Sequence, residues 1–316
     1  MNTTLSRREF LQGTAALGAA SLLAAPGLAA PPALTIIDTH VHFYDPTRPG
    51  GVPWPPKDDK VLYRPALPKD YQALPKPQPV TGVVVAEASP LVEDNQWILD
   101  LAAKEKLIVG FVGNLPVGTD EFAAHLKRFA TNPLFRGLRV RPAPKRERWD
   151  DPRFLADLRL LAERDLSLDL VGGGDILDLI PKLTSAIPSL RIVIDHLASV
   201  RIDGQAPDPT WHQAMRAAAK HPNVFAKVSG LVEGSGRRGG EAPRDTQFYQ
   251  PTLDAMWEMF GEDRLIYGSN WTVCELFSDL ATVQRIVTEY FTAKGTSALG
   301  KVFSKNAQRA YKWVQR

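Results

Sequence analysis

The sequence predicts a (β/α)8 barrel, also called a TIM barrel, and three observations carry this prediction. Eight short runs of apolar and β-branched residues recur along the chain, and segments with helical spacing separate them. Several runs, including 82–86 and 192–194, are apolar almost throughout, which is typical of parallel strands buried on both faces. The length of 316 residues fits one such barrel.

Each expected element follows from this alternation. The eight expected strands are residues 34–39, 82–86, 107–112, 137–140, 166–171, 191–194, 224–228 and 264–267. The expected helices are residues 93–102, 120–131, 152–164, 175–186, 209–220, 251–260 and 280–293. A doubly wound open sheet is the alternative fold. It would prefer a glycine-rich phosphate-binding turn after the first strand, where this chain has His40-Val41-His42.

The composition excludes several classes of protein. With 44% hydrophobic and 23% charged residues, the chain has an ordinary globular composition. The 38 basic and 35 acidic residues are spread along the chain without a dense Lys/Arg run, so we predict no nucleic-acid partner. The single cysteine, Cys274, excludes an intramolecular disulfide framework and a cysteine-based zinc cluster.

The first thirty residues have the composition of a signal peptide. Ser6-Arg7-Arg8-Glu9-Phe10-Leu11 precedes an apolar run and small residues up to Ala30, and a short amphipathic helix is the alternative. The paired arginines resemble a twin-arginine signal, which implies the twin-arginine translocation machinery as a partner and a periplasmic or secreted product. We expect residues 1–30 to be removed and 31–316 to form one domain. No later run is apolar enough to predict a membrane span in the mature protein.

Two long connections follow expected strands and should therefore lie over the C-terminal mouth of the barrel, where TIM-barrel active sites are found. Residues 43–79 are rich in proline and aromatic residues, including Trp54, and we interpret them as a wall of a pocket. Residues 232–246 are rich in glycine and arginine, and we interpret them as a positively charged lid. A crossover wrap and a solvent loop are the respective alternatives.

Histidines follow two of the expected strands. His40 and His42 come at the end of the first strand with a spacing that places both side chains on one face, above Asp38. They could bind a divalent metal ion or act as neutral hydrogen-bond donors. His196 ends the sixth strand, where we expect Ile192, Ile194 and His196 on one face and Asp195 on the other. We interpret the remaining histidines as surface or capping residues, and these are His125, His212 and His221.

Charged residues end other strands. Glu87 follows the second strand and could ligate a metal, accept from a substrate hydroxyl, orient an imidazole or form a structural salt bridge. Arg139 and Arg141 share a face at the end of the fourth strand, and a guanidinium there can bind a substrate carboxylate, for which we favour Arg139. Lys227 lies within the apolar seventh strand, so it is either a site residue or half of a buried ion pair.

Taken in order, these motifs resemble the amidohydrolase-related family of the amidohydrolase superfamily, and its lactonase branch fits best. The motifs that carry the resemblance are 38–42, the long Pro/Trp loop, 83–88, 94–97, 109–112, 135–139, 194–197, 227–230 and 264–271. The resemblance implies a distorted TIM barrel that hydrolyses small anionic lactones of sugar acids or dicarboxylic acids. It implies His40, His42 and His196 as site histidines. They would hold at most one divalent ion, with zinc preferred, or polarise the lactone carbonyl directly. It implies Arg139 as a carboxylate ligand, and Trp54 and Lys227 complete the expected pocket.

One position departs from the family pattern. The last strand of the family ordinarily ends G-S-D-W-P with the aspartate as general base, whereas this chain has Gly268-Ser269-Asn270-Trp271-Thr272. An amide cannot accept a proton in this way, so Asn270 could only orient water or substrate. The base would then be Glu87, Glu275 or a metal-bound hydroxide. Two other functions remain open: a metal-dependent decarboxylase on the same barrel, and a ligand-binding protein without catalysis.

Overall fold

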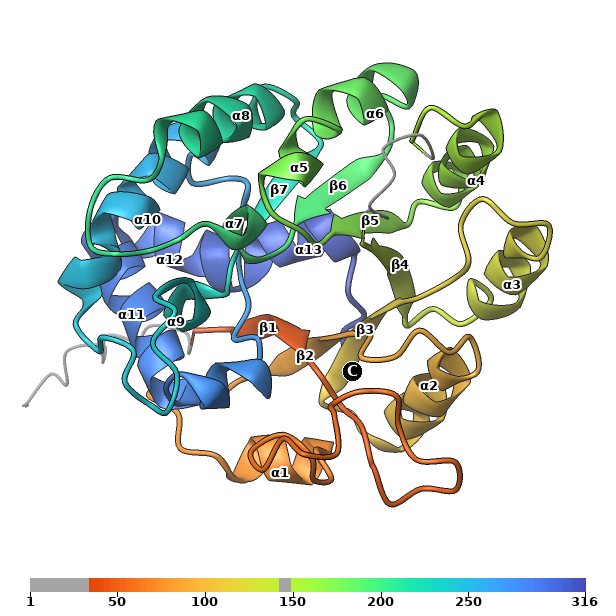
Figure 1. The fold of residues 1–316 in the computed structure, drawn as a ribbon, viewed down its shortest axis with the longest axis horizontal. Helices are drawn as coiled ribbons and strands as arrows, with labels where there is room; N and C mark the ends of the chain where they lie inside the picture. Colours follow the sequence, from red (N-terminus) through yellow and green to blue (C-terminus); the bar gives the residue numbers. More distant parts are fainter. Residues whose placement is uncertain (1–33, 142–148) are drawn as a thin grey trace, which may run out of the picture. The chain divides into compact units, whose positions relative to one another are not determined.

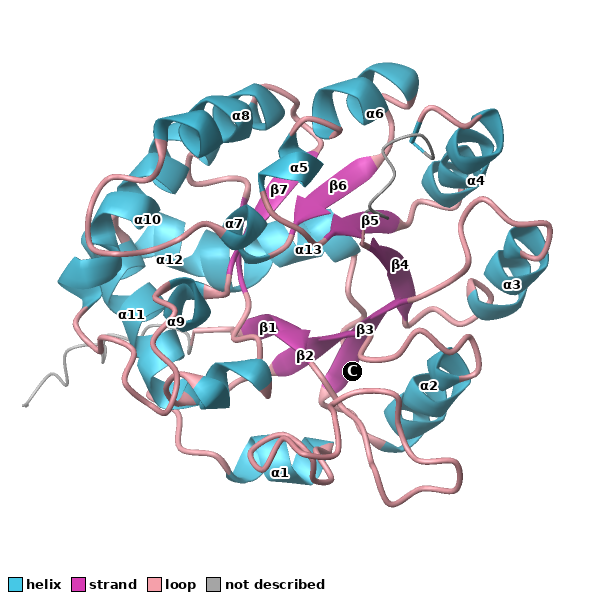
Figure 2. Ribbon diagram, in the orientation of Figure 1, coloured by secondary structure: helices cyan, strands magenta, loops and turns pink. Residues whose placement is uncertain are grey.

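The structure is a computed structural model and describes residues 34–141 and 149–316. Residues 34–316 form one compact unit. The expected signal peptide lies outside the described residues. Eight strands follow one another around a barrel in the order β1 to β8, all pairs are parallel, and helices surround them (Figures 1 and 2). The predicted TIM barrel is confirmed.

The strands lie close to their expected positions. They are β1 Ile37–Val41, β2 Gly82–Ala86, β3 Ile108–Gly113, β4 Phe135–Val140, β5 Ser167–Leu170, β6 Arg191–Ile194, β7 Val224–Val228 and β8 Leu265–Tyr267. Between β8 and β1 the ladder is reduced to a single bridge that pairs Val41 with Trp271, and the backbone N–H of His42 donates to the Trp271 carbonyl over 2.7 Å. The barrel is therefore distorted where its first and last strands meet.

The helices agree with the pattern in most places. They are α1 Pro68–Ala73, α2 Asp94–Lys104, α3 Phe122–Phe129, α4 Pro152–Glu163, α5 Gly174–Leu177, α6 Ile180–Ala186, α7 His196–Ser199, α8 Pro209–Ala219, α9 Leu231–Gly234, α10 Thr246–Phe260, α11 Leu280–Ala293, α12 Thr296–Gly300 and α13 Asn306–Tyr311, with the short turns η3 Val273–Leu276 and η4 Lys301–Lys305. None of the helices in the described ranges is long and apolar enough to cross a bilayer.

Two helical predictions need correction. The single helix expected over 175–186 is two helices, α5 and α6. Pro181 lies in the first turn of α6, the part of a helix where backbone N–H groups make no helical hydrogen bond and proline is therefore tolerated. The helix expected from residue 251 begins at Thr246, because the Asp245 side chain caps it by accepting from the Gln247 N–H.

The barrel interior is packed at the end opposite the expected site. Alternate strand residues fill it, and Ala307, Ala310 and Tyr311 of α13 pack against them from below. The strand residues of this inner cluster are Ile37, Val84, Val109, Val112, Val193, Phe225 and Ile266. Because apolar side chains occupy the lower layers, the polar side chains near the C-terminal strand ends are the ones left to line a cavity.

Candidate active site at the C-terminal mouth

A cavity of about 720 Å³ opens at the C-terminal ends of the strands. That volume suits a small organic ligand. Its polar, charged and aromatic lining includes His42, Trp54, Glu87, Arg139, Arg141, His196, Glu233, Arg238 and Asn270. The structure thus brings most of the sequence-predicted site residues to one cavity, while His40 and Lys227 lie completely buried.

The three predicted site histidines lie together. The ring of His40 is 4.9 Å from that of His42 and 4.3 Å from that of His196, measured between centroids. His42 Nδ1 donates to the Ala86 carbonyl over 3.1 Å, which leaves the Nε2 lone pair of His42 available. Burial lowers the pKa of His42 and of His196 to about 3, so both rings are neutral at neutral pH.

Asp195 lies on the face opposite Ile192 and Ile194, as expected, but His196 does not share the face of these two residues. Val193 points into the barrel, and Asp195, two residues further, also points inward, where its carboxylate meets Arg139 and Lys227. His196 reaches the cavity by another route. It begins a left-handed turn over residues 196–199, with φ near 50° at each residue, which lies outside the strand alternation. Such conformations are costly and are concentrated at functional sites.

The position of His196 depends on its neighbours. Its Nδ1 lies 2.9 Å from the Ser229 hydroxyl, and its Nε2 lies 3.4 Å from Arg139 Nη2. Because a guanidinium only donates, Nε2 of His196 is the acceptor and Nδ1 carries the proton. Gly230 adopts a φ of 67°, and a Cβ there would lie 2.7 Å from the Cβ of His196, so only glycine fits.

Lys227 forms the buried ion pair that was one of its two predicted roles. Its ammonium lies 2.7 Å from Asp169 Oδ2, 2.9 Å from Asp195 Oδ1 and 3.1 Å from His40 Nδ1. These side chains have no exposed surface. Burial alone would raise the pKa of Asp195, but the Lys227 ammonium, His40 and Arg139 hold it well below its usual range.

Arg139 lies in the cavity but already has carboxylate partners. Its Nε donates to Asp195 Oδ2 over 2.8 Å, and its Nη1 lies 3.4 Å from Glu87 Oε1. Burial raises the pKa of Glu87 despite this guanidinium. Arg141, the second predicted arginine, and Arg238, from the loop predicted as a lid, are both exposed and line the same cavity. The exposed guanidinium groups are therefore better placed than Arg139 for a ligand carboxylate.

The sequence interpretation missed Glu233. This residue lies in α9, five residues beyond the last residue of β7, in the segment interpreted as a lid. Asn270, with a φ of 59° that asparagine tolerates, donates from Nδ2 to Glu233 Oε1 over 2.8 Å. Burial raises the pKa of Glu233 to about 7. A carboxylate shortly after a strand end was the only available signal, and the proximity to Asn270 was not visible in the sequence.

Glu275, a candidate base in the sequence, has a different environment. Its Oε2 accepts from Arg64 over 2.5 Å, and its Oε1 accepts from the Trp271 indole over 2.8 Å. The side chain is not part of the cavity lining. Both carboxylate oxygens thus bind neighbouring side chains and hold the end of β8 against the long loop.

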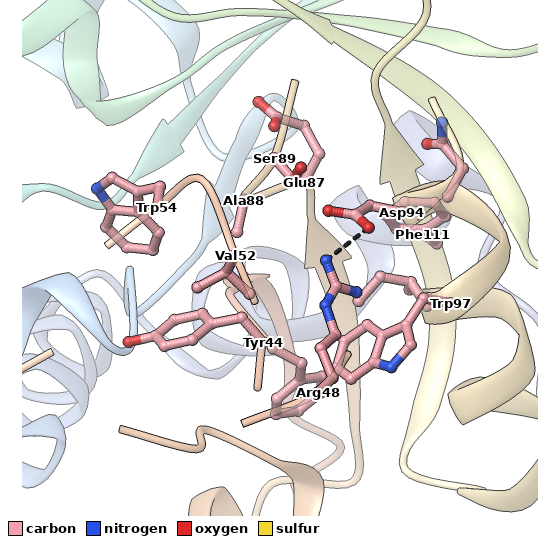
Figure 3. Close-up of a pocket in the computed structure, with 13 residues that line it drawn as sticks. Tyr44, Arg48, Val52, Trp54, Glu87, Ala88, Ser89, Asp94, Trp97 and Phe111 are labelled. Atoms are coloured by element: carbon pink, nitrogen blue, oxygen red, sulfur yellow. Dashed lines mark hydrogen bonds and ion pairs between the residues drawn. The ribbon is translucent and has the colours of Figure 1, made fainter. Parts of the chain in front are cut away.

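The long loop after β1 is anchored beside the cavity. Trp54 makes edge-on contacts with His42 and Tyr44, at centroid distances of 5.6 and 5.4 Å. Arg48 donates to Asp94 over 2.6 Å, and its guanidinium lies 5.0 Å from the centre of the Trp97 ring. Figure 3 shows this arrangement between the loop and α2, with Glu87 at its edge. These contacts hold Trp54 at the cavity.

The donor set suits one divalent ion of the zinc type. His40, Asp195 and His196 each offer a ligand atom, and these atoms lie within 4.8 Å of one another. The Nε2 atom of His40 is buried and has no hydrogen-bond partner in the part of the chain that the structure describes. His42 and His196 have their Nδ1 atoms hydrogen-bonded, as metal-binding histidines commonly do. Of the three expected histidines, His40 and His196 belong to this group together with Asp195, and His42 is not part of it.

The fold and the site define a TIM-barrel hydrolase, with neutral histidines, an arginine–carboxylate network and an acid–amide pair at the C-terminal mouth. Residues 37–313 match the amidohydrolase family, so the chain belongs to that family. Residues 4–24 match a twin-arginine translocation pathway signal sequence, so the protein is exported to the periplasm or secreted.

Curated relatives and solved structures agree with this assignment. An L-fucono-1,5-lactonase from Burkholderia ambifaria is 31% identical over 285 residues, which is 87% of this chain and 95% of the relative. An amidohydrolase of Burkholderia multivorans with bound zinc has a TM-score of 0.76 at 24% identity, over 88% of this chain and 99% of the other. A probable 2-pyrone-4,6-dicarboxylic acid hydrolase from Acinetobacter baumannii with citric acid bound has a TM-score of 0.66 at 18% identity, over 88% and 100%.

Proposed function

We propose that this exported enzyme opens a small anionic lactone by attack of water on the ring carbonyl. The observation that carries the proposal is the cavity at the barrel mouth, where His42 and His196, both neutral, lie beside two exposed arginines. The identity of 31% to a lactonase over most of both chains supports the same reaction class. A sugar-acid or dicarboxylate lactone fits this chemistry.

Polarisation of the carbonyl falls to the histidines. Lys227 Nζ lies 3.1 Å from His40 Nδ1, and an ammonium can only donate, so this contact favours the proton of His40 on Nε2. A buried N–H with no partner among the described residues is suited to stabilise the oxyanion that forms when water attacks. His42 borders the same region with its Nε2 lone pair available, whereas Nε2 of His196 already accepts from Arg139.

A divalent ion would use the same residues. His40, Asp195 and His196 would hold it. When bound, such an ion supplies a Lewis acid for the carbonyl and lowers the pKa of its water. Arg139 keeps one role in either case, because its Nε donates to the Asp195 carboxylate.

The substrate carboxylate is assigned to the exposed arginines. Arg141 follows β4, and Arg238 lies beyond α9 with its guanidinium 5.5 Å from the centre of the Phe277 ring. Both groups line the cavity and can form two-pronged hydrogen bonds with a carboxylate. This assignment replaces Arg139, the residue favoured from the sequence.

Acid release on a lactone panel tests the proposal. Protein starting after residue 30 would be purified without chelator and assayed by pH-stat with sugar-acid and dicarboxylate lactones, with and without added zinc. We expect one stoichiometric proton for each lactone opened. A folded, zinc-supplemented protein that opens none of these lactones but releases carbon dioxide from aromatic acids would overturn the proposal in favour of decarboxylation.

A further inference from the structure

The Glu233–Asn270 pair occupies the place of the aspartate that this chain lacks at the end of β8. Glu233 lies in α9, which packs against η3, the turn that directly follows Asn270-Trp271-Thr272. Both residues line the cavity that also holds His42 and His196. A carboxylate from another loop thus reaches the region where position 270 would ordinarily supply one.

The hydrogen bonding of the pair leaves two acceptors unused. Asn270 Nδ2 donates to Glu233 Oε1 over 2.8 Å. Glu233 Oε2 and Asn270 Oδ1 are both out of contact with solvent and have no hydrogen-bond partner among the described residues. A buried polar atom without a partner is costly, so such atoms commonly have a role in catalysis or binding. Both residues border the cavity, and a water molecule admitted from it has two protons and could donate one to each of these oxygens.

The other candidate bases are less suitable. Both oxygens of Glu275 are bound to Arg64 and the Trp271 indole. Glu87 lines the cavity, and burial raises its pKa, but its Oε1 is already paired with Arg139 Nη1 over 3.4 Å. Within the described cavity lining, Glu233 is the carboxylate whose hydrogen-bond partner is a neutral amide.

We infer that Glu233 is the general base of the lactonase reaction and that Asn270 is its positioning residue; this inference rests on the proposed function. Glu233 Oε2 removes a proton from the water that it holds together with Asn270 Oδ1. The water oxygen bonds to the lactone carbonyl carbon, and the π electrons move to the carbonyl oxygen. When the tetrahedral intermediate collapses, the ring C–O bond breaks, and the leaving oxygen takes the proton from Glu233. The product is the open hydroxy acid.

The electrostatic surroundings support this role. Burial raises the pKa of Glu233 to about 7, near the value at which a base is both ionised and strong enough to act at neutral pH. The titratable groups facing it are the Tyr249 phenol of α10 and the Cys274 thiol of η3, and burial raises the pKa of both, so they stay neutral. The cations in the same lining are Arg139, Arg141 and Arg238.

Exchanging the two side chains tests the assignment. Glu233→Gln should lower kcat by about 10²- to 10⁴-fold, the usual contribution of a general base. The double variant Glu233→Gln/Asn270→Asp places the carboxylate on position 270 and the amide on position 233, so the same hydrogen bond can form in the opposite direction. We expect it to recover at least about tenfold of the lost kcat. The matched control is Glu241→Gln, an exposed residue of the same loop, which should retain wild-type kcat.

The pH profile separates a base from a structural residue. In the wild type, kcat/KM should fall as pH decreases through about 7, because Glu233 becomes protonated. Asn270→Asp alone puts two carboxylates in hydrogen-bond contact, so they should share a proton and the fall should move to higher pH. A merely structural Glu233 would leave the position of the fall unchanged in both variants.

The outcomes also distinguish the two proposals. If the wild type opens lactones and Glu233→Gln keeps its kcat and its acid-side fall, Glu233 is not the base, although the lactonase proposal stands. If the wild type opens none of the lactones while its circular dichroism shows a folded protein, the lactonase proposal fails and the role of Glu233 fails with it. A folded Glu233→Gln/Asn270→Asp double variant that recovers none of the lost kcat would also count against the assignment.

Discussion

The buried and the accessible parts of the site differ in how completely their polar groups are paired. The floor, which consists of His40, Arg139, Asp169, Asp195 and Lys227, is joined by ion pairs and hydrogen bonds and has almost no exposed surface. The rim, which consists of Trp54, Arg141, Glu233, Arg238 and Asn270, lines the cavity and retains exposed or unpartnered polar groups. The floor keeps the histidines in place, while the rim has the free hydrogen-bonding capacity that a substrate and a water need.

The largest effect on stability should follow from removing one partner of the buried ion pairs in the floor. Lys227→Met leaves Asp169 and Asp195 buried without their shared ammonium. Removing one partner of a buried ion pair costs about 3–5 kcal/mol, so we expect the free energy of unfolding to fall by this amount at pH 8. The loss should shrink at pH 5, where the unpaired carboxylates can be protonated. Urea unfolding at both pH values measures this.

The control for that experiment is a surface lysine. Lys294 is exposed and pairs with Asp254 over 3.1 Å, so Lys294→Met should change the free energy of unfolding by about 1 kcal/mol or less. Equal losses for the two variants would show that the buried ion pairs of the floor contribute no more to stability than an exposed ion pair does.

The next largest effect is a gain in stability, and it concerns Glu233 in the rim. Burial raises the pKa of Glu233 from the ordinary 4.5 to about 7, so between these values the folded state binds a proton that the unfolded state releases. Stability is therefore lost as pH rises through this window, and the loss is complete above pH 7. Glu233→Gln should remove it and stabilise the protein at pH 8 by at most about 3 kcal/mol, less where water reaches the residue.

Unfolding curves at pH 4 and pH 8 check this prediction. At pH 4 the variant and the wild type should be nearly equal, because glutamic acid and glutamine are both neutral. A variant that is less stable than the wild type at pH 8 would contradict the proposed cost of the buried carboxylate. Glu241→Gln is again the control, since Glu241 is exposed.

Binding of the substrate carboxylate should give a smaller effect. Arg238→Gln should raise KM about tenfold and leave kcat nearly unchanged, because the contact is the same in the ground state and the transition state. Its neighbour Arg237 is exposed, lies over the Phe248 ring and is not part of the cavity lining, so Arg237→Gln is the matched control. A lactone without a carboxylate should show no difference between the two variants.

The floor and the rim also differ in how far the sequence predicts them. The barrel, the histidines at the end of β1 and the buried Lys227 follow from local patterns, because apolar runs and strand alternation are short-range signals. The placement of His196 on the face of Ile192 and Ile194 was wrong, because β6 ends at Ile194 and a left-handed turn begins at His196. No apolar pattern shows where such a turn starts.

The rim depends on contacts between distant segments. Glu233 and Asn270 are 37 positions apart, and they meet because α9 packs on η3. A loop rich in glycine and arginine does not show which of its residues turns inward. The sequence favoured Arg139 as the carboxylate ligand because it does not show that Arg139 already has partners. Those partners, Glu87 and Asp195, follow β2 and β6, and their pairing with Arg139 is visible only in three dimensions.

The smallest expected effect concerns Trp54, the rim residue whose partners are aromatic. Trp54→Phe keeps a ring beside His42 and Tyr44 but reduces its area, and an aromatic pair contributes about 0.5–1.5 kcal/mol. We expect KM to rise by no more than about threefold, kcat to stay within about twofold, and the acid-side fall of kcat/KM to remain in place. Trp257→Phe, on α10, is a control outside the cavity. If Trp54→Phe instead shifted the pH profile, the loop would be acting on the base, and the separation of aromatic packing from acid–base chemistry within the rim would not hold.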